Sequence, residues 1–245
     1  SDKGSDPASV AYKSLNYDSR KSTSKIRYII IHYTAMNSVS ETIKLLCNSR
    51  SKVSSHFLIS KKGIIYKIVD EEYRAWHAGK SSWKKNSDIN SSSIGIELVN
   101  TGHHLKFEKY PKKQINSLIT LISILKRKYK ISNKNILGHS DVAPNRKIDP
   151  GQKFPWKILA KHKLVYLPKI SKLKINNNLK KSKIIDFKRK LNKIGYDVRI
   201  DSRIDNNFKK ITKAFQMHFQ QNFVTGYPND ESFSLVNKYY KEMFD

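Results

Sequence analysis

Residues 28–32 read Tyr-Ile-Ile-Ile-His, an apolar run that ends in an imidazole. Residues 26–33 as a whole show the continuous apolar pattern that is typical of a buried strand, with polar residues on either side. His32 then lies at the end of that strand, which makes it the first candidate functional residue. A lone histidine in such a position is more often a hydrogen-bonded structural residue, so its role depends on what the rest of the chain brings near it.

Strand-like and helix-like segments alternate around this run. The further predicted strands are residues 56–59 and 64–69, which flank a Lys-Lys-Gly turn and form a hairpin, and residues 94–99 and 135–137. The predicted helices are one capped by Ser40, one that starts at Pro111 and carries apolar residues at helical spacing as far as Leu125, and one at residues 156–161. Residues 80–93 read as a polar loop. The alternation predicts an α/β domain with a central mixed sheet flanked by helices.

The rest of the chain differs in composition. Residues 1–23 are polar and are predicted to form an extended arm, and residues 166–181, rich in lysine and asparagine, are predicted to be a linker. Residues 182–245 contain three amphipathic segments and predict a small three-helix domain. The α/β domain then occupies residues 24–165.

The net charge of +28 over 245 residues predicts a cationic surface and an anionic partner. Nucleic acid, a membrane surface and an acidic wall polymer all fit, but a coding bias toward lysine, asparagine and isoleucine explains the charge equally well. The basic residues are spread along the chain rather than gathered on one motif, so no nucleic-acid partner is expected. Cys47 is the only cysteine, which excludes an intrachain disulfide and a cysteine-based zinc site.

Several side chains that could bind a metal or take part in catalysis lie in residues 138–151. This loop is rich in proline and glycine and contains His139, Lys147 and Asp149. Two imidazoles and a carboxylate, with His32 as the second imidazole, are a sufficient protein shell for a catalytic zinc, because such a site leaves the fourth position to water. A nearby lysine could stabilise negative charge that develops on a substrate oxygen.

Other interpretations of these residues stay open on the sequence alone. The spacing by itself favours a polar turn at residues 139–141, and His103 with His104 or Asp141 could supply ligands instead. Glu97 interrupts an apolar strand, where it either faces water or is partly buried with a raised pKa that suits a general base. No phosphate-binding glycine loop and no serine nucleophile elbow is present.

Five segments taken together resemble the zinc-dependent N-acetylmuramoyl-L-alanine amidases of the amidase-2 type, which are related to peptidoglycan recognition proteins. They are residues 30–35, 54–58, 75–79, 93–98 and 138–151, in matching order over roughly residues 25–165. Residues 214–219 are similar to the second helix of the peptidoglycan-binding three-helix domain that envelope-attached members of the family carry.

The resemblance implies a role for each matching residue. His32, His139 and Asp149 would bind Zn²⁺, Glu97 would be the general base and Lys147 would stabilise the oxyanion. The bond cleaved would join N-acetylmuramic acid, or its 1,6-anhydro form, to L-alanine. Tyr33, Trp76 and His77 would line the substrate groove, although the pair Trp76-His77 could equally close the edge of a core.

The partner would be peptidoglycan or a muropeptide, and the alternative is a protein that binds this material without turnover. No run of residues approaches the eighteen or so apolar residues that span a bilayer. The expected location is the periplasm or cell envelope, with attachment through an N-terminal segment that precedes Ser1. The sequence does not establish an oligomeric state.

Overall fold

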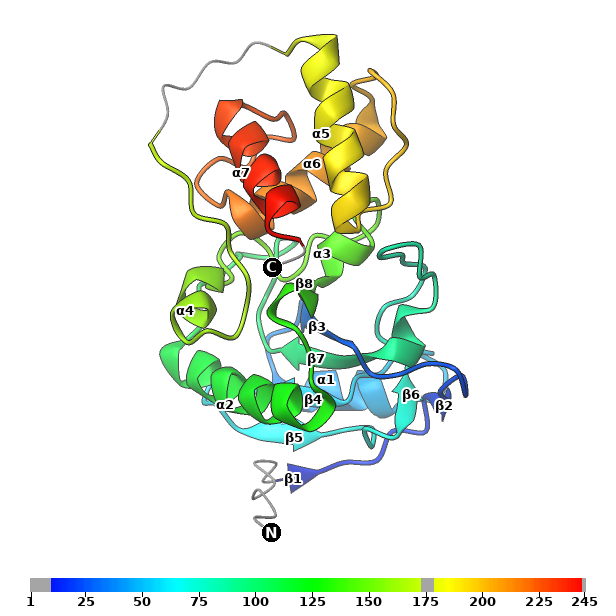
Figure 1. Ribbon diagram of the computed structural model, residues 1–245. Helices are drawn as coiled ribbons and strands as arrows, with labels where there is room; N and C mark the ends of the chain where they lie inside the picture. Colours follow the sequence, from blue (N-terminus) through cyan, green and yellow to red (C-terminus); the bar gives the residue numbers. More distant parts are fainter. Residues whose placement is uncertain (1–9, 173–178, 244–245) are drawn as a thin grey trace.

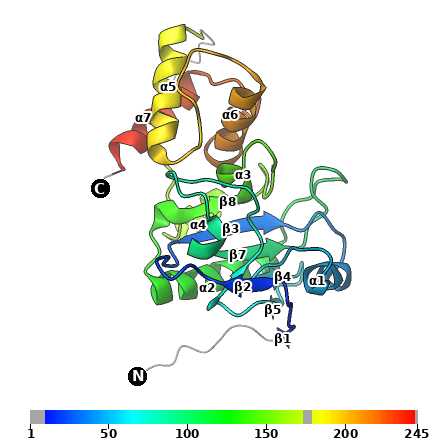
Figure 2. The ribbon, with the colours of Figure 1, turned by 90° about the vertical axis from the view of Figure 1, so that its right-hand side faces the viewer.

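The computed structural model describes residues 10–172 and 179–243, which form a sheet-containing domain and a bundle of three helices stacked on it (Figures 1 and 2). Residues 1–9 of the predicted arm and 173–178 of the predicted linker lie outside the described residues. The strands are β1 (Val10–Ala11), β2 (Tyr17–Ser19), β3 (Tyr28–Tyr33), β4 (Phe57–Ile59), β5 (Ile65–Lys67), β6 (Tyr73–Ala75), β7 (Ser93–Leu98) and β8 (Ile136–Gly138). The helices are α1 (Val39–Cys47), α2 (Lys112–Tyr129), α3 (His139–Val142), α4 (Trp156–Lys161), α5 (Lys181–Ile194), α6 (Asn206–Phe219) and α7 (Asp230–Lys241).

Six strands form one mixed sheet in the order β1-β5-β4-β7-β3-β8. The β4–β5 hairpin is antiparallel, as predicted, and the other pairs are parallel. Strand β3 lies between β7 and β8, and Ile29, Ile30 and Ile31 are fully buried because the sheet is covered on both faces. The prediction of an α/β fold with a central mixed sheet flanked by helices is confirmed.

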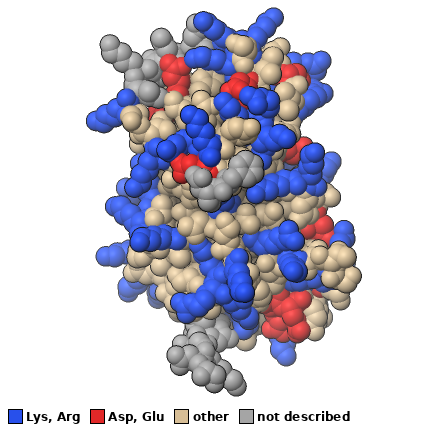
Figure 3. Space-filling model, viewed as in Figure 1, with Lys and Arg blue, Asp and Glu red and all other residues tan. Residues whose placement is uncertain are grey.

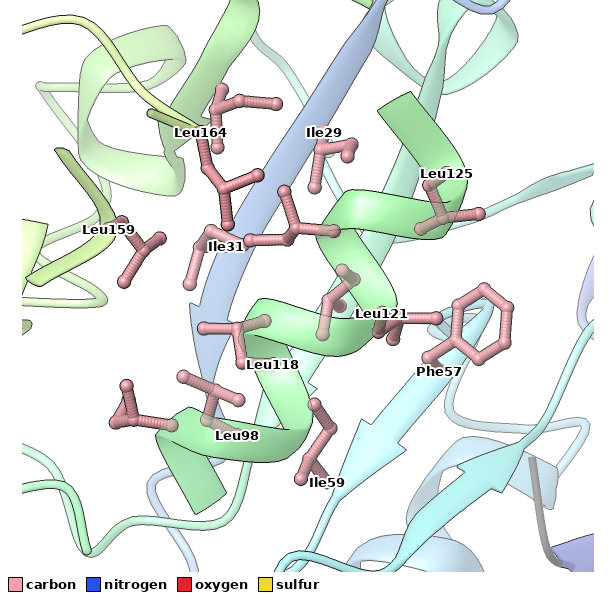
Figure 4. Close-up of a cluster of buried hydrophobic side chains, with 14 of the residues drawn as sticks. Ile29, Ile31, Phe57, Ile59, Leu98, Leu118, Leu121, Leu125, Leu159 and Leu164 are labelled. Atoms are coloured by element: carbon pink, nitrogen blue, oxygen red, sulfur yellow. The ribbon is translucent and has the colours of Figure 1, made fainter. Parts of the chain in front are cut away.

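One face of the sheet is covered by α2, whose apolar stripe packs on β3, β4 and β7. Figure 4 shows Leu118, Leu121 and Leu125 of α2 in one cluster with strand residues, where Leu121 lies beside Phe57. Each such side chain contributes roughly 1.5–3 kcal/mol when it is fully buried, so this layer stabilises the packing of α2 on the sheet.

Two different elements share the opposite face. Helix α1 contributes Leu46 to a cluster over β4 with Leu58. The helical bundle packs over β3 and β8, where Tyr28, Ile30 and Leu137 belong to the same apolar cluster as the cores of α5, α6 and α7. Side chains alternate along a strand, so the next residue of β3 on this face after Ile30 is His32. It lies in the space between the two coverings.

Several element boundaries differ from the sequence prediction. Ser38, not Ser40, caps α1, because its side chain accepts a hydrogen bond from the backbone of Glu41. Pro111 precedes α2 as its N-cap rather than forming its first turn. The predicted loop at 80–93 contains a short 3₁₀ helix that starts after Asp88, whose side chain accepts from the backbone of Ser91. Propensity alone does not locate such caps, since they depend on side-chain geometry.

The N-terminal and C-terminal regions contact the sheet-containing domain more closely than the predicted extended arm and linked helical domain would require. Strand β1 extends the main sheet beside β5, and β2 pairs with β6 in a separate two-stranded sheet. The three C-terminal helices form as predicted, and α5 ends at Gly195. The predicted domain boundaries at residues 165 and 182 stay predictions.

Candidate active site

Three buried side chains converge at the carboxyl ends of β3 and β8. Nδ1 of His32 lies 2.9 Å from Nδ1 of His139. Oδ2 of Asp149 lies 3.2 Å from Nδ1 of His139 and 3.3 Å from Nδ1 of His32. Among the described residues these three form the group of histidine, cysteine and acidic side chains whose geometry can hold a metal ion, with all ligand atoms within 4.8 Å of one another.

The sheet and one loop bring these ligands together across more than 100 residues of sequence. His32 is on β3, and His139 follows directly after β8, the strand that pairs with β3. Asp149 returns to the same point because the backbone N–H of Ser140 donates to the Asp149 carbonyl at 3.0 Å. The close fit needs a glycine at position 138, where a Cβ would lie 2.7 Å from Cδ of Pro150.

The imidazole nitrogens of His32 and His139 that point away from the cluster have hydrogen-bond partners that are compatible with a cation between the two rings. Nε2 of His139 donates to the carbonyl of Ala78 at 3.0 Å, so in the neutral imidazole its Nδ1 carries a free lone pair. Nδ1 of His32 and Oδ2 of Asp149 lie beside that lone pair, so three potential ligand atoms meet at one point when the His32 proton is on Nε2. N₂O donors of this kind suit zinc among other divalent metal ions.

His77 supports the candidate ligand His32 from behind. Its Nδ1 lies 2.9 Å from Nε2 of His32, and its Nε2 lies 2.9 Å from Oγ of Ser93. If Nδ1 of His32 faces the other candidate ligands without a proton, its Nε2–H donates to Nδ1 of His77. Nε2–H of His77 then donates to Oγ of Ser93. Outer partners of this kind fix the orientation of a metal-binding ring. The resemblance gave His77 a place in the substrate groove, and no local pattern signals this contact, because His32 and His77 are 45 residues apart.

Glu97 lies directly opposite His32, because the parallel register of β3 and β7 pairs the two residues. Paired residues of neighbouring strands point to the same face, so the carboxyl group lies on the side of the sheet that carries the ligands. Its Oε2 is buried without a hydrogen-bond partner among the described residues. Burial raises the pKa of Glu97 well above its ordinary value, and repulsion from Asp149 adds to the rise, whereas Lys147 opposes it.

A pocket of about 280 Å³ opens over these groups. The eight residues to which the resemblance assigns a role all line it: His32, Tyr33, Trp76, His77, Glu97, His139, Lys147 and Asp149. Lys147 is exposed, and Trp76 is half-buried, with its ring nitrogen donating to Asp18 of β2 at 3.2 Å. The pocket therefore combines a candidate metal site, a carboxyl group, a lysine and an aromatic wall.

The alternative ligands lie elsewhere. Nε2 of His103 donates to Oε1 of Gln152, and its Nδ1 accepts from the hydroxyl of Tyr33. His104 lines the pocket as an exposed residue outside the candidate ligand group. Asp141 turns away from the pocket toward the helical bundle, where Tyr196 and His218 hold its carboxylate. The sequence did not single out either of these two partners.

Known proteins match this chain in sequence and in structure. The amidase-2 family model, described as N-acetylmuramoyl-L-alanine amidase, matches residues 22–152. The N-acetylmuramoyl-L-alanine amidase AmiD of Escherichia coli is 31% identical over 231 residues, which cover 86% of this chain and 81% of that protein. The 1,6-anhydro-N-acetylmuramyl-L-alanine amidase AmpD of Haemophilus influenzae is 40% identical over 106 residues, 43% of this chain and 55% of that protein.

Solved structures match over both domains. E. coli AmiD in complex with the substrate anhydro-N-acetylmuramic acid-L-Ala-D-γ-Glu-L-Lys superposes with a TM-score of 0.80 at 29% identity, covering 92% of this chain and 94% of that one. AmpDH3 of Pseudomonas aeruginosa in complex with anhydromuramic pentapeptide gives a TM-score of 0.74 at 28% identity, covering 87% and 90%. The family match and the likeness over nearly the whole chain agree with the site geometry: this chain belongs to the amidase-2 family of N-acetylmuramoyl-L-alanine amidases.

Proposed function

We propose that this chain hydrolyses the amide bond between N-acetylmuramic acid, or its 1,6-anhydro form, and L-alanine in peptidoglycan or muropeptides. The observation that carries the proposal is the convergence of His32, His139 and Asp149 beside a buried, unpaired carboxyl oxygen of Glu97. The three residues would hold Zn²⁺. When bound, such an ion supplies Lewis-acid chemistry toward a carbonyl oxygen and acidifies water to a pKa of about 7.

The proposed general base is Glu97, which takes the proton from the attacking water. Its raised pKa fits this task, because a base that holds its proton more tightly accepts one more readily near neutral pH. The same carboxyl group can then deliver the proton to the departing amine of L-alanine. Water and amide together give a carboxylic acid and an amine, so no further reactant is needed.

Lys147 is the proposed stabiliser of the tetrahedral oxyanion. It lies beside Arg146 on the loop between His139 and Asp149, and its side chain lines the same pocket as Glu97. A cation close to the position where negative charge develops lowers the barrier more than it strengthens substrate binding. Tyr33 and Trp76 offer aromatic surface for the sugar or the stem peptide.

Charge on the outer surface fits an acidic polymer. Lysine and arginine side chains cover much of the face shown in Figure 3, over the amidase domain and the helical bundle alike. Stem peptides carry carboxylates, so this surface would raise the rate of encounter with peptidoglycan, and the effect would weaken as salt is added. The periplasm or cell envelope is the proposed location. No helix in the described part of the chain is long and apolar enough to cross a membrane.

Mass spectrometry of a purified anhydro-muropeptide tests the proposal. Incubation with the protein should release the free stem peptide, a chelator should stop the release, and Zn²⁺ should restore it. An unchanged muropeptide, in a preparation shown to contain one zinc per chain, would instead support the reading as a peptidoglycan-binding protein without turnover.

A further inference from the structure

A buried carboxylate joins the helical bundle to the segment that carries the proposed metal ligands. Asp141 is 1% exposed and lies two residues after the ligand His139. It accepts three hydrogen bonds: from the backbone N–H of Gly138 at 2.8 Å, from the Tyr196 hydroxyl at 2.5 Å and from Nδ1 of His218 at 2.7 Å. We call Asp141, Tyr196 and His218 the Asp141 cluster.

Both side-chain donors of the cluster come from the helical bundle and are firmly held. Tyr196 follows α5 and packs edge-on against Trp83, with ring centroids 4.8 Å apart. His218 is on α6, and its ring stacks on Trp156 at 3.8 Å and on its neighbour Phe219 at 3.9 Å. Neither donor can move to follow a displaced carboxylate without losing these ring contacts.

The position of Asp141 is coupled to both ligands of the loop. Oδ2 of Asp141 accepts the hydrogen bond from Gly138, which closes the turn that presents His139. The backbone N–H of Ser140, two residues after Gly138, donates to the carbonyl of Asp149 at 3.0 Å. A shift of the Asp141 carboxylate is therefore transmitted to His139 through the turn and to Asp149 through this backbone bond.

Helix α6 also contacts the far side of the same loop. Nδ2 of Asn207, in its first turn, donates to Oδ1 of Asn145 at 2.9 Å, whereas His218 in its last turn donates to Asp141. Asn145 lies two residues before Lys147. One rigid helix thus holds the loop that carries His139, Lys147 and Asp149 at two points.

We propose that the helical bundle is a structural part of the metal centre, and that Tyr196 and His218 are positioning residues which act on His139 and Asp149 through Asp141. This inference rests on the proposed metal site at His32, His139 and Asp149. A bundle whose task is only to bind peptidoglycan has no need of a buried hydrogen-bonded carboxylate next to the ligands. Removal of the Tyr196 hydroxyl leaves Oδ1 of Asp141 without its hydrogen-bond donor, and removal of Nδ1 of His218 leaves Oδ2 with the backbone N–H of Gly138 alone. Either loss weakens the hold on a buried carboxylate, which then moves to a new position.

The test measures Co²⁺ and Zn²⁺ binding to the full chain by competition with a chelating dye, together with the visible absorption of the Co²⁺-loaded protein, which reports ligand geometry. Tyr196→Phe and His218→Phe keep the rings and remove the donors. Each should lower metal affinity about 10- to 100-fold, as loss of an outer partner does, and change the Co²⁺ absorption. Gln221→Ala is the matched control, because Gln221 makes a hydrogen bond of 2.7 Å to Phe154 across the same interface without touching Asp141.

The outcomes separate this inference from the proposed metal site. Asp149→Ala, measured alongside, should lose metal binding, and unchanged binding there would reject the metal site itself. If Asp149→Ala loses the metal while both donor variants keep the affinity and absorption of the unaltered chain, the positioning role is wrong and the cluster only stabilises the interface. Should His218→Phe fail to fold, Tyr196→Phe decides alone, since it removes a single oxygen atom.

Discussion

The ring of His77 stands perpendicular to the ring of His32, with their centroids 5.1 Å apart and Nδ1 of His77 2.9 Å from Nε2 of His32. This arrangement depends on Gly95 of β7, where a Cβ atom would lie 2.4 Å from Cγ of His77. The strand thus leaves room for an imidazole that orients the proposed ligand His32. The motif Gly95-Ile96-Glu97 supplies both this space and the proposed base.

Gly95→Ala should therefore weaken metal binding about 10- to 100-fold by displacing His77, although position 95 faces no ligand directly. Chelator competition measures the affinity. The same substitution placed in a His77→Ala background should cost little further affinity, because the crowded ring is gone. A full additional loss in that background would show that Gly95 acts by another route.

Glu97→Gln should lower kcat about 10²- to 10⁴-fold and leave the metal content unchanged, since the amide keeps the shape of the side chain but cannot take up a proton. Stopped assays on an anhydro-muropeptide give kcat, and metal analysis of the same sample gives occupancy. Near-normal turnover by Glu97→Gln would remove this residue from the mechanism.

Lys147→Met should lower kcat about 10²- to 10³-fold with a smaller change in KM, because the lost cation acts mainly on the transition state. Lys147 also lowers the pKa of Glu97. Its removal should raise that pKa and shift the acidic limb of the pH–rate profile to higher pH. Lys109→Met, which removes an exposed cation outside the pocket, is the control and should leave both quantities unchanged. An unshifted acidic limb would contradict the coupling.

Buried neutral histidines should make the metal-free protein lose stability in acid. Burial, together with repulsion from Arg20, lowers the pKa of His56 to about 3, and burial, together with repulsion from His139, lowers that of His32 to about 4, from an ordinary value of 6.5. The unfolded chain takes up these protons near pH 6.5, so stability is complete above that pH. It is then lost as the pH falls toward 4 and 3, by about 1.4 kcal/mol per pH unit for each histidine.

Urea unfolding of His56→Gln between pH 7.5 and 4.5 measures this contribution. The slope of unfolding free energy against pH below 6.5 should become shallower by about 1.4 kcal/mol per pH unit. His162→Gln, at an exposed imidazole, should leave the slope of the unaltered chain. An equal slope in all three proteins would assign the acid sensitivity to other groups.

Local pattern determined much of this molecule from the sequence alone. The isoleucines of residues 29–31 predicted the central buried strand, and Lys61-Lys62-Gly63 predicted the hairpin, because hydrophobic period and turn chemistry act over a few residues. The five segments in matching order identified the family, which its model and two solved relatives bear out. The proposed ligands His32, His139 and Asp149 followed from that resemblance, whereas their spacing alone favoured a polar turn.

Tertiary structure decided which of the remaining polar residues serve the site. Asp141 and Asp149 are eight positions apart in one loop and could not be distinguished by type, yet one meets the two imidazoles and the other meets Tyr196 and His218. His77 supports His32 rather than only lining a groove. These partners come from strands and helices that are distant in the sequence. Their pairing is set by register, by close packing and by the burial of the bundle against β3, none of which a local pattern encodes.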